Sequence, residues 1–95
     1  MRIEFIICPD EINEKLAHKH NVTEQEARQV LLNKPRIRFA ENGYIDGEDV
    51  YAAIGRTFGG RYLSVFFVYK PDNKIAILIS ARTMSHKERK AYGRK

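Results

Sequence analysis

Two neighbouring stretches of the chain, residues 61–69 and 74–81, carry apolar side chains on both of the faces that an extended strand presents. Successive side chains of a strand point to opposite sides of a sheet, so a strand of this kind has to be shielded from water on both sides. We therefore expect both stretches to be central strands. Residues 71–73, Pro-Asp-Asn, are typical of a turn and make the two strands antiparallel neighbours.

Two more strands are expected before this pair. Residues 50–58 lead into it across Gly59-Gly60, a dipeptide that suits the positive backbone dihedrals of a tight hairpin turn. In residues 36–39 arginine alternates with apolar side chains, which predicts a half-buried strand. A polar, glycine-containing loop over residues 41–49 should connect the two.

The N-terminal part predicts one strand and one short helix. Residues 2–7 are rich in Ile and Phe, and Pro9 ends this strand because proline has no N–H to donate to a sheet. Between residues 11 and 20, apolar side chains recur at helical spacing. Asn21 suits the end of this helix, because asparagine tolerates the left-handed backbone conformation.

Capping boxes mark the start of two more helices. Thr23 and Glu26 form the first, with Val22 placed to pack on Ala27, and the helix should end near residue 33 because Pro35 disfavours helical geometry before it. Ser85 and Glu88 form the second, so a short helix is expected over residues 88–92, with Gly93 ending it.

The order of these elements predicts an α+β fold. It comprises an N-terminal strand, two helices, an antiparallel sheet meander of three to four strands and a short C-terminal helix. A chain of 95 residues has room for one hydrophobic core, so residues 1–95 are expected to form a single domain.

The composition excludes several classes of protein. Apolar residues make up 43% and charged residues 31%, as in an ordinary globular domain rather than a disordered chain. No apolar run exceeds five residues, and the N-terminus lacks the apolar core of a signal peptide, so we expect a cytoplasmic protein that makes no contact with a membrane. The single cysteine, Cys8, excludes an internal disulfide and a thiolate zinc site.

The net charge of +5 lies entirely at the C-terminus. Residues 1–81 hold eleven basic and eleven acidic residues, whereas residues 82–95 hold six basic residues and one glutamate. Such a segment favours a nucleic acid or an acidic protein as partner, because Lys and Arg displace counterions from phosphates. A solvated, partly frayed tail is the alternative.

Few side chains point to a particular chemistry. The chain has no phosphate-binding glycine loop, no His-Glu-x-x-His motif and no nucleophile elbow, which argues against nucleotide hydrolysis, zinc proteolysis and esterase chemistry. His20, beside the apolar stripe of its helix, is either a structural histidine or a proton-transfer or phosphate contact. Arg82 follows a central strand, where a guanidinium needs a bidentate anion or several carbonyls, and its position favours a structural salt bridge over a phosphate contact.

Three blocks of sequence, taken in order, resemble the BrnT-type toxins of bacterial type II toxin–antitoxin systems, which belong to the RelE-like ribonuclease superfamily. Residues 10–27 resemble the opening helix pair of that family, with Asn21 where the family has glycine. The second block is Gly-Arg-Tyr-Leu at residues 60–63. The third, residues 79–92, contains Ser-Ala-Arg followed by Glu-Arg and a tyrosine, as the family's ending does.

The resemblance implies a RelE-like fold and a toxin that cleaves RNA without a metal or other cofactor, and so inhibits translation and growth. It also implies a cognate antitoxin with a ribbon-helix-helix region, which neutralises the toxin and through which alone the pair contacts operator DNA. The alternative is a non-catalytic basic module that grips an antitoxin or RNA with its C-terminal helix.

Attack of an RNA 2′-hydroxyl on the neighbouring phosphate needs a base, an acid and cations around the phosphorane. If the resemblance holds, Arg61, Arg82 and Arg89 would supply these cations. His20 is the leading acid or base, with Glu88 and Tyr92 as alternatives, and Tyr92 could instead stack on an unpaired base. The catalytic candidates are His20, Arg61, Arg82, Glu88, Arg89 and Tyr92, and the RNA-binding candidates are Lys19, Ser85, Lys87 and Lys90.

Overall fold

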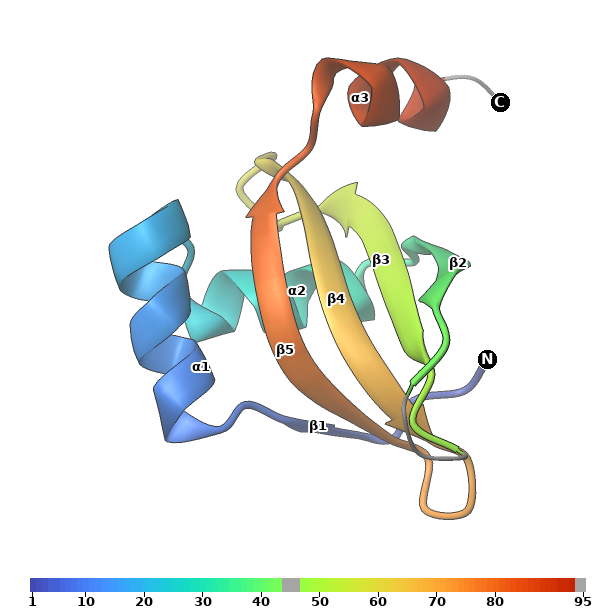
Figure 1. The fold of residues 1–95 in the computed structure, drawn as a ribbon. Coiled ribbons are helices and arrows are strands. Elements are labelled where there is room, and N and C mark those ends of the chain that lie inside the picture. The colour runs from blue at the N-terminus through green and yellow to red at the C-terminus, as the bar shows by residue number, and fades with distance from the viewer. Residues whose placement is uncertain (44–46, 94–95) are drawn as a thin grey trace.

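A computed structural model describes residues 1–43 and 47–93 of the chain, and its centre is a five-stranded sheet (Figure 1). The order across the sheet is β1-β5-β4-β3-β2. The strands are β1 (Phe5–Ile7), β2 (Arg36–Glu41), β3 (Val50–Arg56), β4 (Tyr62–Lys70) and β5 (Ile75–Thr83). The α+β class and the meander from β2 to β5 are confirmed, and β4 and β5 are interior strands as expected.

The N-terminal strand changes the predicted sheet in one respect. β1 joins the meander beside β5 in parallel, which makes the sheet mixed and five-stranded rather than an antiparallel sheet of three to four strands. This pairing joins residues about 70 positions apart, Phe5 with Ile75 for example, and no local pattern encodes it. Of the loop predicted over residues 41–49, Glu41 extends β2, and residues 44–46 lie outside the described part of the chain.

The helices begin where the capping signals place them. α1 (Asp10–Lys15) continues as a π-helical segment, η1 (Leu16–His20), which ends at Asn21 with the expected left-handed backbone, φ 51°. The capping boxes of α2 (Glu24–Leu32) and α3 (His86–Tyr92) are both present. α3 starts two residues before the predicted helix, because the residue directly after the N-cap Ser85 is already helical.

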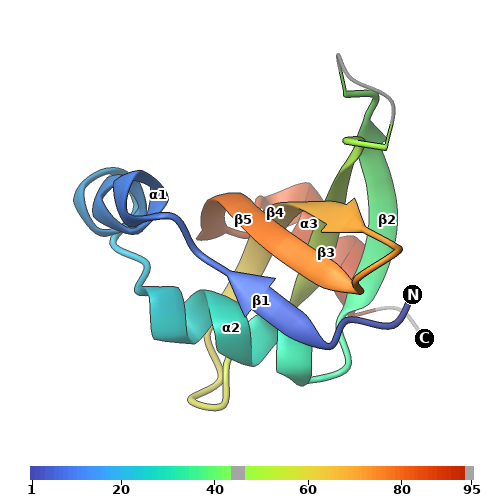
Figure 2. The same cartoon turned by 90° about the horizontal axis from the view of Figure 1, so that it is seen from below.

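The helices are divided between the two faces of the sheet (Figure 2). Leu16 and Val30, from η1 and α2, belong to one buried cluster with Leu63, Val65 and Phe67 of β4. A smaller cluster on the other face consists of Ala52, Ile54 and Met84, with Tyr62, Phe66 and Tyr92 packed against it. α3 therefore covers the opposite side of the sheet from α1, η1 and α2.

A β-bulge decides the direction in which Arg82 points. Phe66 pairs with Ser80 but its neighbour Phe67 pairs with Leu78, so β5 contains one extra residue at this point. Beyond the bulge the alternation of β5 is inverted, and Arg82 stands opposite Ser64 instead of on the buried side of Leu78. The bulge thus moves the guanidinium out of the core and beneath α3.

The β3–β4 hairpin places Arg56 and Tyr62 opposite each other under α3. Of the two glycines in the turn, Gly60 alone has a positive φ, 91°. The backbone N–H of Thr57 donates to the Arg61 carbonyl, and the Arg61 N–H donates to the Thr57 hydroxyl. This closed turn explains that register.

Among the helices of residues 1–43 and 47–93, none has the length and apolar composition of a membrane-spanning segment.

Candidate functional site

The side of the sheet beneath α3 gathers arginines and tyrosines from five elements, β2, β3, β4, β5 and α3 itself, and we call it the α3 face. Arg36 and Arg38 come from β2, where every second side chain points to the same side. The face consists of Arg36, Arg38, Arg56, Tyr62, Ser64, Arg82, Glu88, Arg89 and Tyr92.

Glu88 is the centre of hydrogen bonding on this face. Arg82 donates to it from both terminal guanidinium nitrogens, from Nη1 to Oε1 at 2.6 Å and from Nη2 to Oε2 at 3.0 Å. The Ser64 hydroxyl donates to Oε1 at 3.1 Å, and the Ser85 backbone N–H donates to the same oxygen at 2.8 Å. Arg38 approaches Oε2 at 3.5 Å. The bidentate salt bridge expected for Arg82 is confirmed, and α3 supplies its anion.

These contacts set the proton affinity of Glu88. The hydrogen bonds from Arg82, with further help from the Ser85 N–H, lower the pKa of the Glu88 carboxyl from 4.5 to about 2. At neutral pH the side chain is a carboxylate that has no proton to donate and accepts one poorly. In the structure its contacts connect Arg82 to the N-terminus of α3.

Tyr62 and Tyr92 form an aromatic pair surrounded by guanidinium groups. Their rings meet edge to face with centroids 6.0 Å apart. The Arg89 guanidinium carbon lies 3.4 Å from the Tyr62 ring centroid, and Arg56 Nη1 lies 3.5 Å from the Tyr62 hydroxyl oxygen. Arg36 donates to the Ala91 carbonyl and sits over the Tyr92 ring at 5.8 Å. The hydrogen bond from Arg56, together with the charge of Arg89, lowers the pKa of the Tyr62 phenol.

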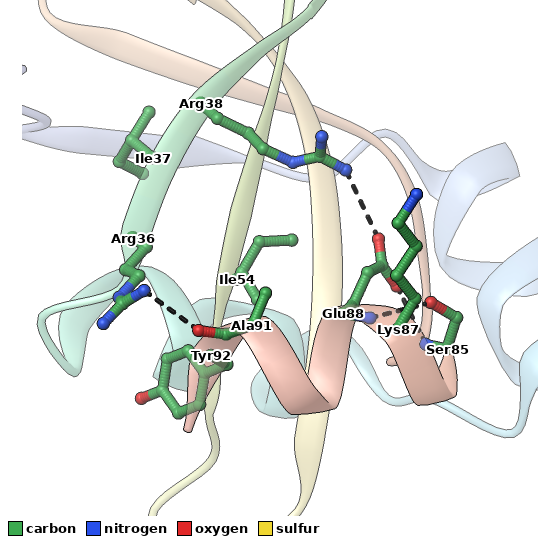
Figure 3. Close-up of a pocket in the computed structure, with 9 residues that line it drawn as sticks. All are labelled: Arg36, Ile37, Arg38, Ile54, Ser85, Lys87, Glu88, Ala91 and Tyr92. Atoms are coloured by element: carbon green, nitrogen blue, oxygen red, sulfur yellow. Dashed lines mark hydrogen bonds and ion pairs between the residues drawn. The ribbon is translucent and has the colours of Figure 1, made fainter. Parts of the chain in front are cut away.

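Two adjoining grooves open on the α3 face. The first, about 560 Å³, lies between β2, β3 and α3, and its lining includes the apolar side chains of Ile37, Ile54 and Ala91 (Figure 3). The second, about 500 Å³, is lined by Lys34, Arg36, Arg56, Tyr62, Arg89, Tyr92 and Gly93. Glu88 is the one carboxylate among the described residues that line either groove. The face therefore offers a positive, partly aromatic surface suited to an anionic ligand.

His20 and Arg61 form a separate group. Arg61 Nη1 donates to the Asn21 carbonyl at 2.7 Å and to Glu26 at 3.1 Å, and Nη2 reaches the His20 carbonyl at 3.5 Å. Through these contacts Arg61 ties the end of η1 to the capping box of α2. The His20 side chain is half-buried and Lys19 is exposed.

The predicted site residues thus fall into two sets. Arg82, Glu88, Arg89 and Tyr92 meet on the α3 face, and Lys87 lines its first groove. Ser85 contributes as the N-cap of α3, and Lys90 is exposed. His20, Arg61 and Lys19 belong to η1 and the hairpin turn, and no hydrogen bond, ion pair or ring contact within residues 1–43 and 47–93 links them to the first set.

Sequence reasoning missed five members of the α3 face: Arg36, Arg38, Arg56, Tyr62 and Ser64. A signal existed for two of them, because the alternation in residues 36–39 places Arg36 and Arg38 on one side of a strand. Arg56 and Tyr62 become neighbours only once the hairpin register is fixed. Ser64 lies in an apolar run and reads as an ordinary strand residue.

No three His, Cys, Asp or Glu side chains in the described part of the chain gather closely enough to hold a metal ion.

Comparison with known proteins identifies the family. A search of curated proteins found no match. The family model described as "Ribonuclease toxin, BrnT, of type II toxin-antitoxin system" matches residues 10–88, which include Arg61, Arg82 and Glu88 and end just before Arg89. With most of its length matched, this chain belongs to the BrnT family of type II toxin–antitoxin ribonuclease toxins.

Proposed function

We propose that this chain is a metal-independent endoribonuclease whose site is the α3 face, and that its activity inhibits translation and growth. The observation that carries the proposal is the convergence of five arginines and two tyrosines on one face where, among the described residues, Glu88 is the single carboxylate. Membership of a ribonuclease toxin family supports it.

The chemistry of RNA cleavage suits this face. When the 2′-hydroxyl attacks the adjacent phosphorus, negative charge grows on the phosphoryl oxygens, and guanidinium groups already in place stabilise that charge. Arg56 and Arg89 stand beside Tyr62 without a carboxylate partner in the described residues. Arg82 is paired with Glu88, so it would add positive charge near the phosphate without contacting it directly. Tyr92 offers a ring on which an unpaired RNA base can stack. Lys87 and Lys90 supply further positive charge that attracts the phosphate backbone of the RNA.

Membership of a type II family implies an antitoxin partner. We propose that this antitoxin has a ribbon-helix-helix region, neutralises the toxin by covering the α3 face, and carries all contact with operator DNA. We further propose that the pair acts in the cytoplasm. Acidic and apolar groups of the antitoxin would complement the arginines and the apolar lining of the first groove.

One observation favours the alternative, a non-catalytic module that grips RNA or an antitoxin. Glu88 occupies both terminal nitrogens of Arg82 and also approaches Arg38, so this one carboxylate partly neutralises both arginines. A surface of this kind binds anions even when it has no catalytic power.

Growth on induction separates these functions. Expression of the chain in a bacterial host that lacks the antitoxin is expected to arrest growth, and co-expression of the cognate antitoxin should restore it. Growth curves and total RNA on a gel, taken before and after induction, provide the measurement. Normal growth and intact RNA, despite soluble accumulation of the chain, would leave the binding module as the better account.

A further inference from the structure

We propose that Tyr62 is a catalytic residue of the cleavage reaction, whose hydroxyl gives its proton to the departing 5′ oxygen of the RNA. The inference rests on the proposed function and adds to it the group that acts as general acid. It concerns a side chain outside the catalytic set predicted from the sequence.

The position of Tyr62 supports this role. It is the first residue of β4, where the hairpin places it opposite Arg56, and α3 covers it from above with Arg89 and Tyr92. Its ring lines the second groove, to which Lys34 and Arg36 also contribute. No carboxylate in the described residues lines this groove. An anionic phosphate entering it therefore meets cations on several sides and the Tyr62 hydroxyl among them.

The surroundings of the hydroxyl favour loss of its proton. Arg56 Nη1 lies 3.5 Å from the hydroxyl oxygen, and the Arg89 guanidinium lies 3.4 Å from the ring centroid. Both positive charges stabilise the phenolate that remains after proton transfer, and the lowered pKa of Tyr62 agrees with this. A phenol whose pKa is lowered in this way is a better proton donor than an isolated tyrosine.

Other acids on this side of the sheet are less suitable. Glu88 carries no proton at neutral pH, because its pKa is about 2. Tyr92 makes no hydrogen bond through its hydroxyl to any residue within the described ranges, whereas the Tyr62 hydroxyl accepts one from Arg56. His20 belongs to η1, which packs on the other face.

The proposed step balances without a metal or a co-reactant. The 2′ oxygen forms a bond to phosphorus, and the bond between phosphorus and the 5′ oxygen breaks. The 2′-hydroxyl proton passes to solvent water, and the Tyr62 proton passes to the 5′ oxygen. The products are a 2′,3′-cyclic phosphate and a 5′-hydroxyl, and the phenolate recovers a proton from solvent.

The test compares two RNAs that differ in one atom at the bond the wild-type protein cleaves. One RNA has the natural 5′ oxygen and the other has sulfur at that position, which leaves as a thiolate and needs no general acid. In the full-length chain, Tyr62→Phe is expected to slow cleavage of the natural RNA by about 10²- to 10⁴-fold. On the sulfur-containing RNA, the variant and the wild type should cleave at nearly equal rates.

Tyr51→Phe is the matched control, because it removes a hydroxyl from a tyrosine that packs against Phe67 on the other side of the sheet. This variant should cleave both RNAs as the wild type does. The wild-type rate on natural RNA should also fall at high pH, where Tyr62 loses its proton, and Tyr62→Phe should lack that limb of the pH profile.

Two results would overturn the assignment of Tyr62. The first is an unchanged rate for Tyr62→Phe on natural RNA. The second is an equal loss of rate on both RNAs, because that loss would show that Tyr62 only positions its neighbours or maintains the fold. A wild-type protein that cleaves neither RNA would instead contradict the proposed function itself.

Discussion

Replacing Arg56 and Arg89 together with alanine is expected to reduce RNA cleavage by about 10³-fold or more, since removal of one oriented charge-stabilising donor typically costs 10²- to 10³-fold in rate. Both guanidiniums flank Tyr62 and neither has a carboxylate partner among the described residues, so both are available to a phosphate. Both side chains belong to exposed residues, and the fold should lose little stability.

The control for this double variant removes the same amount of charge elsewhere. Arg2→Ala with Lys15→Ala takes two positive charges from exposed positions outside the α3 face. This control should keep the wild-type rate if local geometry matters, and should lose rate equally if only net charge does. The readout is initial cleavage rate, with circular dichroism to verify that each variant is folded.

Glu88→Gln is expected to give the largest loss of stability among changes on the α3 face. The shift of the Glu88 pKa from 4.5 to about 2 corresponds to at most about 3 kcal/mol at neutral pH. Arg82 is 39% exposed, so solvent screening should reduce the loss to about 1–2 kcal/mol. Glutamine retains the shape of the side chain and the capping box, so the change isolates the charge.

The pH dependence of this effect has a definite sign. Because folding lowers the pKa of Glu88, the stabilisation is fully present above the ordinary pKa of 4.5 and is lost as the pH falls through about 2. Urea denaturation of the wild type and the variant should therefore differ at pH 7 and converge in acid. Glu24→Gln, which breaks the more exposed pair with Arg28, should cost less than about 0.5 kcal/mol. Superimposable curves for wild type and Glu88→Gln at pH 7 would show that the Arg82 pair contributes nothing to stability.

Local signals in the sequence predicted local structure well. The two capping boxes each depend on residues three positions apart, and both form as expected. The left-handed backbone at Asn21 follows from the conformational preference of that one residue. The two central strands follow from their double-sided apolar pattern, and Leu63 and Phe67 are fully buried in the structure.

Features that depend on distant pairing could not be predicted. Arg82 was expected to need a bidentate anion or several carbonyls, but the partner it finds depends on a β-bulge in β5 and on the direction in which α3 folds back. Likewise, the cationic surroundings of Tyr62 are assembled from β3, β4 and α3. His20 is a candidate from the sequence because imidazole is the usual proton-transfer group near neutral pH, but η1 packs on the face of the sheet opposite the arginines of the α3 face.

The most direct test of the account is RNA cleavage by the purified, antitoxin-free wild-type protein in EDTA. We expect a long unstructured RNA to be cut into fragments with 2′,3′-cyclic phosphate and 5′-hydroxyl ends, at a rate that EDTA does not change. Cleavage that EDTA abolishes would contradict the metal-independent mechanism. Equal cleavage by the wild type and by the Arg56→Ala, Arg89→Ala variant would contradict the assignment of the α3 face as the site.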